Sequence, residues 1–232
     1  AIRVGRLITE YLIHKYDAVL IIYHSSDEAA IELKNKYSDD QIKLFRCDLM
    51  DPVALKKVAD LIFSKFSVEL IINNASVMKD GSIMDTSHES LLSHYAIHLF
   101  APILLSQYLM RCSGDHILDL HIINILDIKV YTNKTKRASY LLSKKSLKDF
   151  TKMAALEFSP HVRVNGIAIG WIYDPNGSVR SETEQSKYLD KIPLKRKVSE
   201  HDLLSTIDFL LDNTQLTGQI INLAGGSELK TG

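Results

Sequence analysis

Short apolar runs alternate with longer amphipathic stretches along most of this chain. The runs are rich in Ile, Leu and Val, and in the longer stretches the apolar positions recur every three or four residues, the spacing of one helix face. This alternation is typical of βα units built around a parallel sheet. We therefore predict strands at residues 18–23, 42–46, 70–72, 117–125, 162–168 and 219–223, and helices at residues 6–15, 27–36, 52–66, 89–111, 138–158 and 200–211.

The predicted strands read as unbroken apolar runs. A strand of this kind is buried on both faces, as in a parallel sheet that helices cover on both sides. The pattern predicts an α/β fold of three layers with a doubly wound parallel sheet. No internal repeat, low-complexity tract or linker interrupts it, so we predict a single domain over residues 1–232.

Two segments depart from the regular pattern. Residues 171–196 are crowded with Pro, Gly, Ser and charged residues, and long irregular loops in compact domains are usually functional. We expect a mobile flap over a substrate site there. The chain also opens on a helix pattern, whereas a doubly wound fold begins with a strand and a glycine turn that holds a dinucleotide pyrophosphate. Only Gly5 of such a turn is present, so we expect the first strand to be missing from the sequence as given.

Composition narrows the class of partner. The chain is 46% hydrophobic and 24% charged, which fits a globular domain with a substantial core. Because 28 Lys+Arg balance 28 Asp+Glu, no excess of positive charge favours nucleic acid or a membrane surface. No apolar run is long enough to span a bilayer. Cys47 and Cys112 lie far apart outside any CxxC pattern, which favours a reducing, cytoplasmic compartment.

Tyr140 and Lys144 are candidate catalytic residues on the helix predicted at 138–158. Residues four apart share one helix face. A cation near a phenol favours the phenolate and lowers the phenol pKa, which makes tyrosine a usable general acid. We therefore expect Lys144 to lower the pKa of Tyr140. Such a pair is common on helices, so its context has to support it.

Further polar residues follow the predicted strands at their carboxyl ends, the edge where open α/β sheets bind ligands. Asn74, Ala75 and Ser76 follow the strand at 70–72, and Asp127 follows the strand at 117–125, thirteen residues before Tyr140. The next strand ends in the run RVNGIAIG at 163–170, and TGQ at 217–219 opens the last strand.

The joint pattern of NNAS, YxxxK, RVNxIxxG and TGQ, in this order, resembles the short-chain dehydrogenase/reductase family over essentially the whole chain. The resemblance implies a Rossmann fold and a nicotinamide held near Asn74 and Gly170. It also implies that Lys144 binds the cofactor ribose, that Tyr140 donates a proton, and that Asp48 and Leu49 contact the adenine. A homotetramer paired through the helices at 89–111 and 138–158 is implied as well.

Three places resemble the pteridine reductase branch of that family. Asp127 stands where most members have serine, YHSS at 23–26 is similar to the branch's YHRS, and Arg3 stands where the branch replaces the middle glycine of the turn. This closer resemblance implies an oxidoreductase that reduces a dihydropterin or dihydrofolate, a small-molecule substrate. Asp127 then relays or positions the proton of Tyr140.

The residues after the strand predicted at 18–23 indicate the cofactor, because this strand is the second one of a complete fold of this kind. An NAD enzyme places Asp or Glu there to bind the ribose 2′-hydroxyl, and a carboxylate at that place repels a 2′-phosphate. This sequence has His24, Ser25 and Ser26, and we expect Arg3 to lie nearby. We therefore predict NADPH as the cofactor.

Several residues depart from the family pattern and keep alternatives open. His98 replaces an asparagine, and Met78 replaces an aromatic residue that stacks on the pterin. Trp171 either lines the substrate cleft in place of that aromatic residue or packs beneath the flap. His94 and His98 have no evident third ligand, so we expect no metal site. The alternatives are a carbonyl reductase acting on a 3-oxoacyl thioester and a weakly catalytic cofactor-binding protein.

Overall fold

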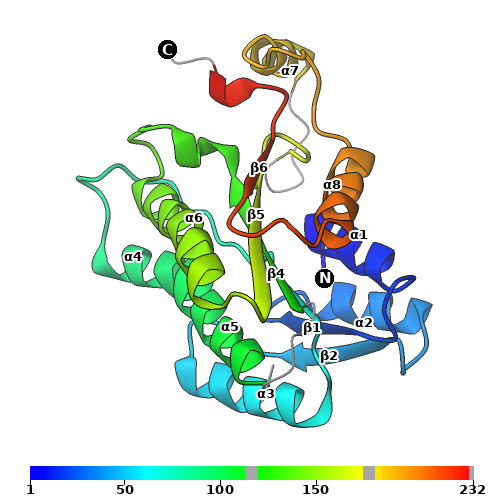
Figure 1. Ribbon diagram of the computed structural model, residues 1–232. Coiled ribbons are helices and arrows are strands. Elements are labelled where there is room, and N and C mark those ends of the chain that lie inside the picture. The colour runs from blue at the N-terminus through cyan, green and yellow to red at the C-terminus, as the bar shows by residue number, and fades with distance from the viewer. Residues whose placement is uncertain (113–119, 175–180, 230–232) are drawn as a thin grey trace.

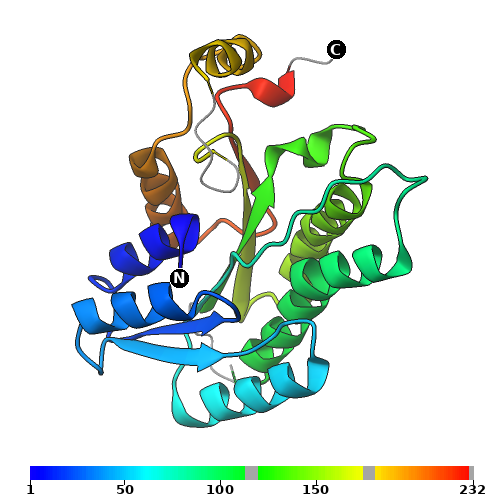
Figure 2. The same cartoon turned by 180° about the vertical axis from the view of Figure 1, so that it is seen from behind.

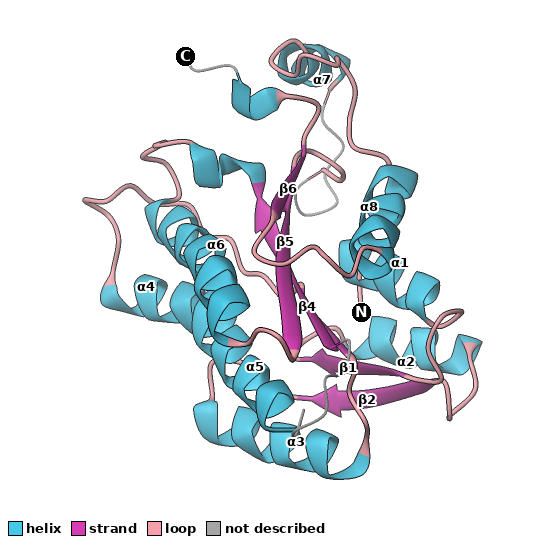
Figure 3. Cartoon of the chain, viewed as in Figure 1, coloured by secondary structure: helices cyan, strands magenta, loops and turns pink. Residues whose placement is uncertain are grey.

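The computed structural model describes residues 1–112, 120–174 and 181–229. Figures 1 and 3 show strands in the middle of the molecule with helices on either side, and Figure 2 shows the same layers from behind. The strands are β1 (Val19–Tyr23), β2 (Ile42–Arg46), β3 (Leu70–Asn73), β4 (Leu120–Asp127), β5 (Val162–Ile169) and β6 (Ile220–Leu223). The helices are α1 (Arg3–Leu12), α2 (Asp27–Lys36), α3 (Pro52–Lys65), α4 (His88–Tyr95), α5 (Ala101–Cys112), α6 (Ala138–Glu157), α7 (Glu182–Leu189) and α8 (Glu200–Asp212), with a π segment η1 (Ala96–Phe100) and short 3₁₀ turns η2 (Ile128–Tyr131) and η4 (Ser227–Leu229).

All paired strands run parallel, as predicted. Among the described residues they form two hydrogen-bonded sheets, one of β1 and β2 and one in the order β3-β4-β5-β6. In the larger sheet Asn73 is in register with Asn124, and Asp127 with Ile169. The chain therefore leaves β3, β4 and β5 at the same edge, and this edge carries Asn74, Asp127 and Gly170.

Alternate side chains of the central strands face two helical layers. Ile123 and Ile125 of β4 pack in one core cluster with residues of α1 and α8. Leu120 and Ile122 of the same strand pack in another cluster with residues of α5 and α6. Because successive side chains of a strand point to opposite faces, both faces of the sheet are buried. The predicted three-layer, doubly wound α/β fold is confirmed.

The helix predicted at 89–111 is interrupted, which the sequence pattern did not indicate. α4 ends at Tyr95, the π segment η1 follows, and α5 begins at Ala101. Pro102 has no N–H to donate to the carbonyl four residues before it. The N–H of Ala101 instead bonds the carbonyl of Ala96, five residues back. The proline thus accounts for a π turn in the middle of this helical stretch.

The remaining differences lie at the ends of elements. Helix α1 begins at Arg3 rather than at residue 6, and the segment 171–196 contains α7, which begins with a capping box at Ser181. Residues 117–119 of the fourth predicted strand lie outside the described residues, as do residues 175–180 of the flap. The mobility of that flap stays a prediction. Within the described ranges, every helix is too short or too polar to cross a bilayer.

Candidate active site

The hydroxyl of Tyr140 donates a hydrogen bond to the carboxylate of Asp127 across a distance of 2.9 Å. Tyr140 lies in the first turn of α6, and Asp127 is the last residue of β4. The other carboxylate oxygen of Asp127 accepts the N–H of Lys129 at 2.8 Å, where η2 begins. This cap fixes the carboxylate, so the phenol and the acid face each other at the carboxyl edge of the sheet.

The pKa of Tyr140 is raised well above its ordinary value, first by burial and then by the charge and hydrogen bond of Asp127. The prediction that Lys144 lowers the Tyr140 pKa is therefore wrong. Burial disfavours the charged phenolate, and a neighbouring carboxylate disfavours it further. The phenol therefore keeps its proton at neutral pH and has one to donate.

Lys144 lies one helical turn after Tyr140 and is buried, with 3% of its surface exposed. Its ammonium donates to the carbonyl oxygen of Ile125 in β4 at 2.8 Å. Burial lowers the Lys144 pKa to about 8, although the charge of Asp127 acts in the opposite direction. Both side chains face β4, so the predicted shared helix face is confirmed. A buried cation stands behind the Tyr140–Asp127 pair.

A cleft opens beside this pair, lined by residues at the carboxyl ends of β4 and β5 and by aromatic side chains of residues 171–173 and of α7. It brings together six predicted site residues with four that the sequence analysis did not assign to the site. The predicted ones are Arg3, Met78, Asp127, Tyr140, Gly170 and Trp171. The additional ones are Lys129, Arg137, Tyr173 and Tyr188.

Arg3 lies at this cleft and not beside Ser25 and Ser26, where we expected it. Its guanidinium donates to the carbonyl of Asp174 at 2.9 Å and lies 5.7 Å from the centre of the Tyr173 ring. A cation is attracted to the face of an aromatic ring, so these contacts draw the side chain toward the cleft.

Trp171 fits both alternatives given for it, since it lines the cleft and also packs against the segment that was predicted as a flap. It is buried and packs edge to face against Tyr188 of α7, with ring centres 4.9 Å apart, and it also lines the cleft. The ammonium of Lys197 lies 4.0 Å from the centre of its ring. Trp171 therefore links the wall of the cleft to the helix that follows it.

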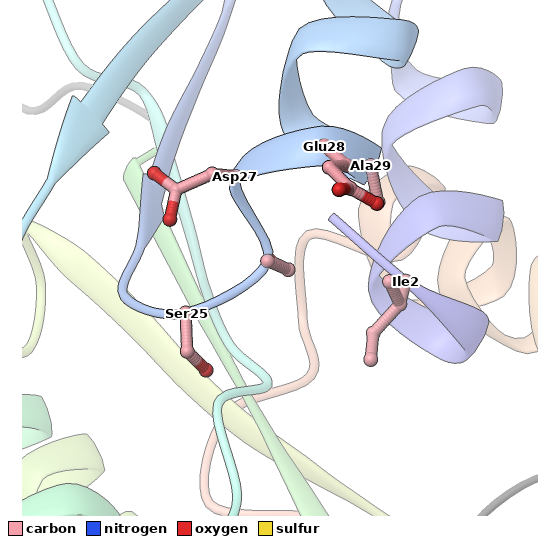
Figure 4. A pocket seen from close by; sticks show the side chains of 6 residues that line it. Ile2, Ser25, Asp27, Glu28 and Ala29 are labelled. Carbon is pink, nitrogen blue, oxygen red and sulfur yellow. The ribbon is translucent and has the colours of Figure 1, made fainter.

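A second pocket lies between the N-terminal ends of α1 and α2. Figure 4 shows Ile2 on one side of it and Ser25 and Asp27 on the other. Ser26 lines the pocket as well, together with Glu28 and Ala29. Two helix N-termini provide backbone N–H groups and the positive ends of two helix dipoles, which favour an anion. The carboxylate of Asp27 is paired with the guanidinium of Arg46 at 3.3 Å, which reduces the negative charge at the pocket.

His24, Asp48 and Leu49, which are predicted to contact the ribose phosphate or the adenine, do not line this pocket. The ring of His24 and the carboxylate of Asp48 approach to 3.9 Å. Asp48 also accepts the N–H of Met50 at 2.9 Å, whereas Asp51 caps α3. Leu49 packs into a small apolar cluster with Cys47. Their contact with an adenine stays a prediction.

Gly5 approaches Asn74 closely, at the point where α1 meets the end of β3. A methyl group at position 5 would lie 2.9 Å from the side-chain nitrogen of Asn74. Ala75 is exposed, and the hydroxyl of Ser76 lies 3.0 Å from a ring nitrogen of His98. The absence of a side chain at Gly5 therefore lets the helix lie against the loop that follows β3.

Substituting Gly5→Ala is expected to change the free energy of unfolding by less than about 1 kcal/mol, because the atom in the way is the free end of the Asn74 side chain and because alanine favours a helix by about 1 kcal/mol over glycine. The added methyl group forces Asn74 or the first turn of α1 to move. Urea unfolding followed by circular dichroism measures the change, with Ser186→Ala on the exposed face of α7 as the control. A loss of more than about 2 kcal/mol relative to the control would show that the Asn74 side chain cannot move aside, since overpacking a rigid contact typically costs about 1–3 kcal/mol.

The cleft residues that the sequence analysis missed have no motif of their own. Tyr188 comes from α7, and both Tyr188 and Tyr173 belong to the segment predicted as an irregular flap. Arg137 ends a basic run with Lys134 and Lys136 just before α6, and from its left-handed backbone (φ 68°) its guanidinium reaches Asp80. Only the three-dimensional path of these segments brings the side chains to the cleft.

Comparison with known proteins gives a family and relatives of two kinds. A family model described as Enoyl-(Acyl carrier protein) reductase matches residues 4–228. The 3-oxoacyl-(acyl-carrier-protein) reductase FabG of Buchnera aphidicola subsp. Baizongia pistaciae is 27% identical, over 90% of this chain and 86% of that protein. The dihydromonapterin reductase of Klebsiella pneumoniae is 27% identical, over 98% of this chain and 93% of that protein. The crystal structure of FolM Alternative dihydrofolate reductase 1 from Brucella canis complexed with NADP superposes with a TM-score of 0.86 at 26% identity, covering 99% and 91% of the two chains.

Proposed function

The chain belongs to the short-chain dehydrogenase/reductase family of oxidoreductases, and on that premise we propose that it is an NADPH-dependent reductase of a pteridine, a dihydropterin or dihydrofolate. The observation that carries the proposal is the hydrogen bond from Tyr140 to Asp127 at 2.9 Å, inside a cleft. This pair supplies a phenol that keeps its proton and an acid that holds it in place.

The residues present fit a nicotinamide dinucleotide. The N-termini of α1 and α2 face one pocket with Ser25 and Ser26, where backbone N–H groups and helix dipoles would favour the phosphates of such a cofactor. Strand β1 is followed by His24, Ser25 and Ser26 and not by an acid that would accept the ribose 2′-hydroxyl, and Arg46 lies next to the pocket. These features support NADPH. When bound, this cofactor supplies the hydride.

The chain's own residues supply the proton and the orientation. Tyr140 donates its phenolic proton to the substrate, and the carboxylate of Asp127 orients the hydroxyl. Lys144 places a buried positive charge next to the site as the tyrosine loses its proton. A proton donor held in the correct direction and a nearby positive charge both lower the energy of the transition state.

A pteridine is supported by the acid and by the aromatic residues of the cleft. A carboxylate at Asp127 can accept a hydrogen bond from the amino group of a pterin, which a serine serves less well. Trp171 and Tyr173 line the cleft and offer flat apolar surface to a planar ring. The dihydromonapterin reductase and FolM relatives support the same substrate class. Loss of an aromatic residue at Met78 speaks against strong stacking on that side.

The second candidate function is reduction of a 3-oxoacyl thioester, which the similarity to FabG favours. The deciding experiment measures NADPH oxidation with dihydrobiopterin, dihydrofolate and acetoacetyl thioester, each with NADPH and with NADH. We expect turnover of at least one pteridine with a lower KM for NADPH than for NADH. Turnover of the thioester alone would support the second function, and no turnover of any substrate would support a cofactor-binding protein.

Substituting Asp127→Ser is expected to lower kcat for the pteridine by about a hundredfold, because the orienting carboxylate and its bond to the pterin are lost. A serine oxygen can still accept the N–H of Lys129, so the fold is expected to persist. Turnover of the thioester should not fall. Asp149→Ser, an exposed carboxylate of α6, is the control. An equal loss with both substrates would contradict a role of Asp127 in pteridine selection.

A homotetramer is part of the same proposal. Large apolar side chains are exposed on the side of the molecule formed by α4, η1 and α6, which supports pairing of these helices with another copy. Size-exclusion chromatography with light scattering tests the assembly, and a monomer at micromolar concentration would contradict it. The exposed side chains are Leu92, Phe100, Leu142, Met153 and Leu156.

A further inference from the structure

Two buried histidines lie one helical turn apart behind the cleft. His94 is in the last turn of α4, and His98 is in the π segment η1. Their exposed fractions are 0% and 1%, and their ring centres lie 5.8 Å apart. The mechanism proposed above uses neither of them. Burying two polar rings is costly unless their nitrogens are hydrogen-bonded, so their partners indicate what they do.

Each ring accepts a backbone N–H from the loop that follows β3. The N–H of Val77 donates to Nε2 of His98 at 3.2 Å, and the N–H of Lys79 donates to Nε2 of His94 at 3.3 Å. A backbone N–H can only donate, so the ring proton of each histidine lies on Nδ1. Burial lowers the His98 pKa to about 2, which keeps that ring neutral and therefore able to accept a hydrogen bond.

The opposite nitrogens anchor the rings to helices. Nδ1 of His98 lies 2.7 Å from the hydroxyl of Ser143 in α6, and Nδ1 of His94 lies 2.6 Å from the carbonyl of Ser90 in α4. The hydroxyl of Ser143 in turn donates to the carbonyl of Tyr140 at 2.9 Å. Both histidines therefore connect the loop after β3 to helices that are themselves fixed.

The two held amides lie on either side of Met78. Met78 lines the cleft, and its sulfur lies 3.1 Å from a guanidinium nitrogen of Arg137. With Val77 and Lys79 both tied back to histidines, the residue between them has little freedom to move its backbone. An exposed loop without a strand partner is otherwise free to shift by more than the precision a substrate pocket needs.

We propose that His94 and His98 are positioning residues that hold Met78 as one wall of the substrate cleft and thereby set the affinity for the substrate. The inference rests on the proposed function of that cleft. It assigns a purpose to a histidine pair whose spacing alone suggests a metal site. Among the described residues, no group of three or more His, Cys, Asp or Glu side chains is placed to hold a metal ion.

A second role for the rings has to be separated from this one. Both pack edge to face against the Tyr140 ring, with centres 6.3 Å away for His94 and 5.5 Å for His98. His94→Phe keeps an aromatic ring at Tyr140 and removes the acceptor for Lys79. His94→Gln keeps an acceptor near the position of Nε2 and removes the ring. The two variants therefore exchange one contact for the other.

If His94 holds Met78 in place, His94→Phe should raise the substrate KM about tenfold with little change in kcat. A tenfold change is the effect of losing one hydrogen bond to a buried group. His94→Gln should restore the KM toward that of the unchanged protein. The opposite order, with Gln impaired in kcat and Phe unaffected, would overturn the proposal in favour of ring packing on Tyr140.

Hydrogen exchange of the backbone tests the contact without any activity. Exchange at Lys79 should be about tenfold faster in His94→Phe than in His94→Gln, because the protecting acceptor is lost. Unchanged exchange would overturn the proposal even if KM changes. If the unchanged protein turns over no substrate, the proposed function fails, while the exchange result still stands or falls by itself.

A substitution in the exposed loop covers the case in which His94→Phe does not fold. Lys79→Pro removes the donor of the same hydrogen bond and leaves both histidines in place. It should raise the substrate KM, as His94→Phe does. An unchanged KM in a folded Lys79→Pro variant would overturn the proposal.

Discussion

Substituting Tyr140→Phe is expected to lower kcat by a factor of about 10² to 10⁴, the usual contribution of a positioned general acid. Phenylalanine keeps the ring that packs against His94 and His98 but has no proton to give. Because the phenol pKa is raised by burial and by Asp127, the unchanged protein has this proton available throughout the neutral range. Steady-state oxidation of NADPH with the pteridine that is turned over measures the loss.

Binding of the cofactor should change little in the same variant, because the hydroxyl's hydrogen bond goes to Asp127. Fluorescence titration with NADPH checks this, and Tyr37→Phe, at the end of α2 and far along the chain from the cleft residues, serves as the control. Retention of more than a tenth of kcat in a folded Tyr140→Phe variant would show that another group delivers the proton.

The arrangement of the sheet could be predicted from the sequence because burial on both faces imposes a simple pattern. Unbroken runs such as 162–168 marked the strands, and residues that follow a run had to lie at the carboxyl edge. For this reason the sequence pattern places Asp127, Tyr140 and Gly170 at one edge of the sheet, and the structure brings them to one cleft.

Features that depend on a single side-chain contact could not be predicted in the same way. The π turn follows from the missing N–H of Pro102 and changes no apolar spacing. The direction of Arg3 depends on Tyr173 and Asp174, more than 160 residues away in the sequence. The Tyr140 pKa depends on burial and on Asp127, neither of which helix spacing reveals. A spacing of four residues predicts that two side chains share one face of a helix, but it does not predict which group each side chain contacts.

Substituting Lys144→Met is expected to lower kcat/KM by about a hundredfold or more, since it removes a buried positive charge beside the reacting groups. The same change should make the protein without nucleotide more stable at pH 7. Burial lowers the Lys144 pKa from 10.5 to about 8, and each pKa unit corresponds to about 1.4 kcal/mol, so keeping the ammonium charged costs about 3 kcal/mol. The loss of its hydrogen bond to Ile125 lowers the free energy of unfolding by about 1 kcal/mol, so the net gain in stability is about 2 kcal/mol.

The pH dependence of both quantities distinguishes this account from a general effect of packing. The unfolded chain binds the Lys144 proton up to pH 10.5 and the folded chain only up to about 8, so stability of the unchanged protein rises between these values. The gain from Lys144→Met should therefore be full below pH 8 and become a loss of about 1 kcal/mol above about pH 10.5, where only the missing hydrogen bond to Ile125 remains, as urea unfolding across that range measures. In the unchanged protein, kcat/KM for reduction should fall as the pH rises through about 8, because Lys144 loses its charge. A stability gain that is the same at pH 7 and above pH 10.5 would mean that methionine packs better, and that the ammonium is held without the cost assigned to it.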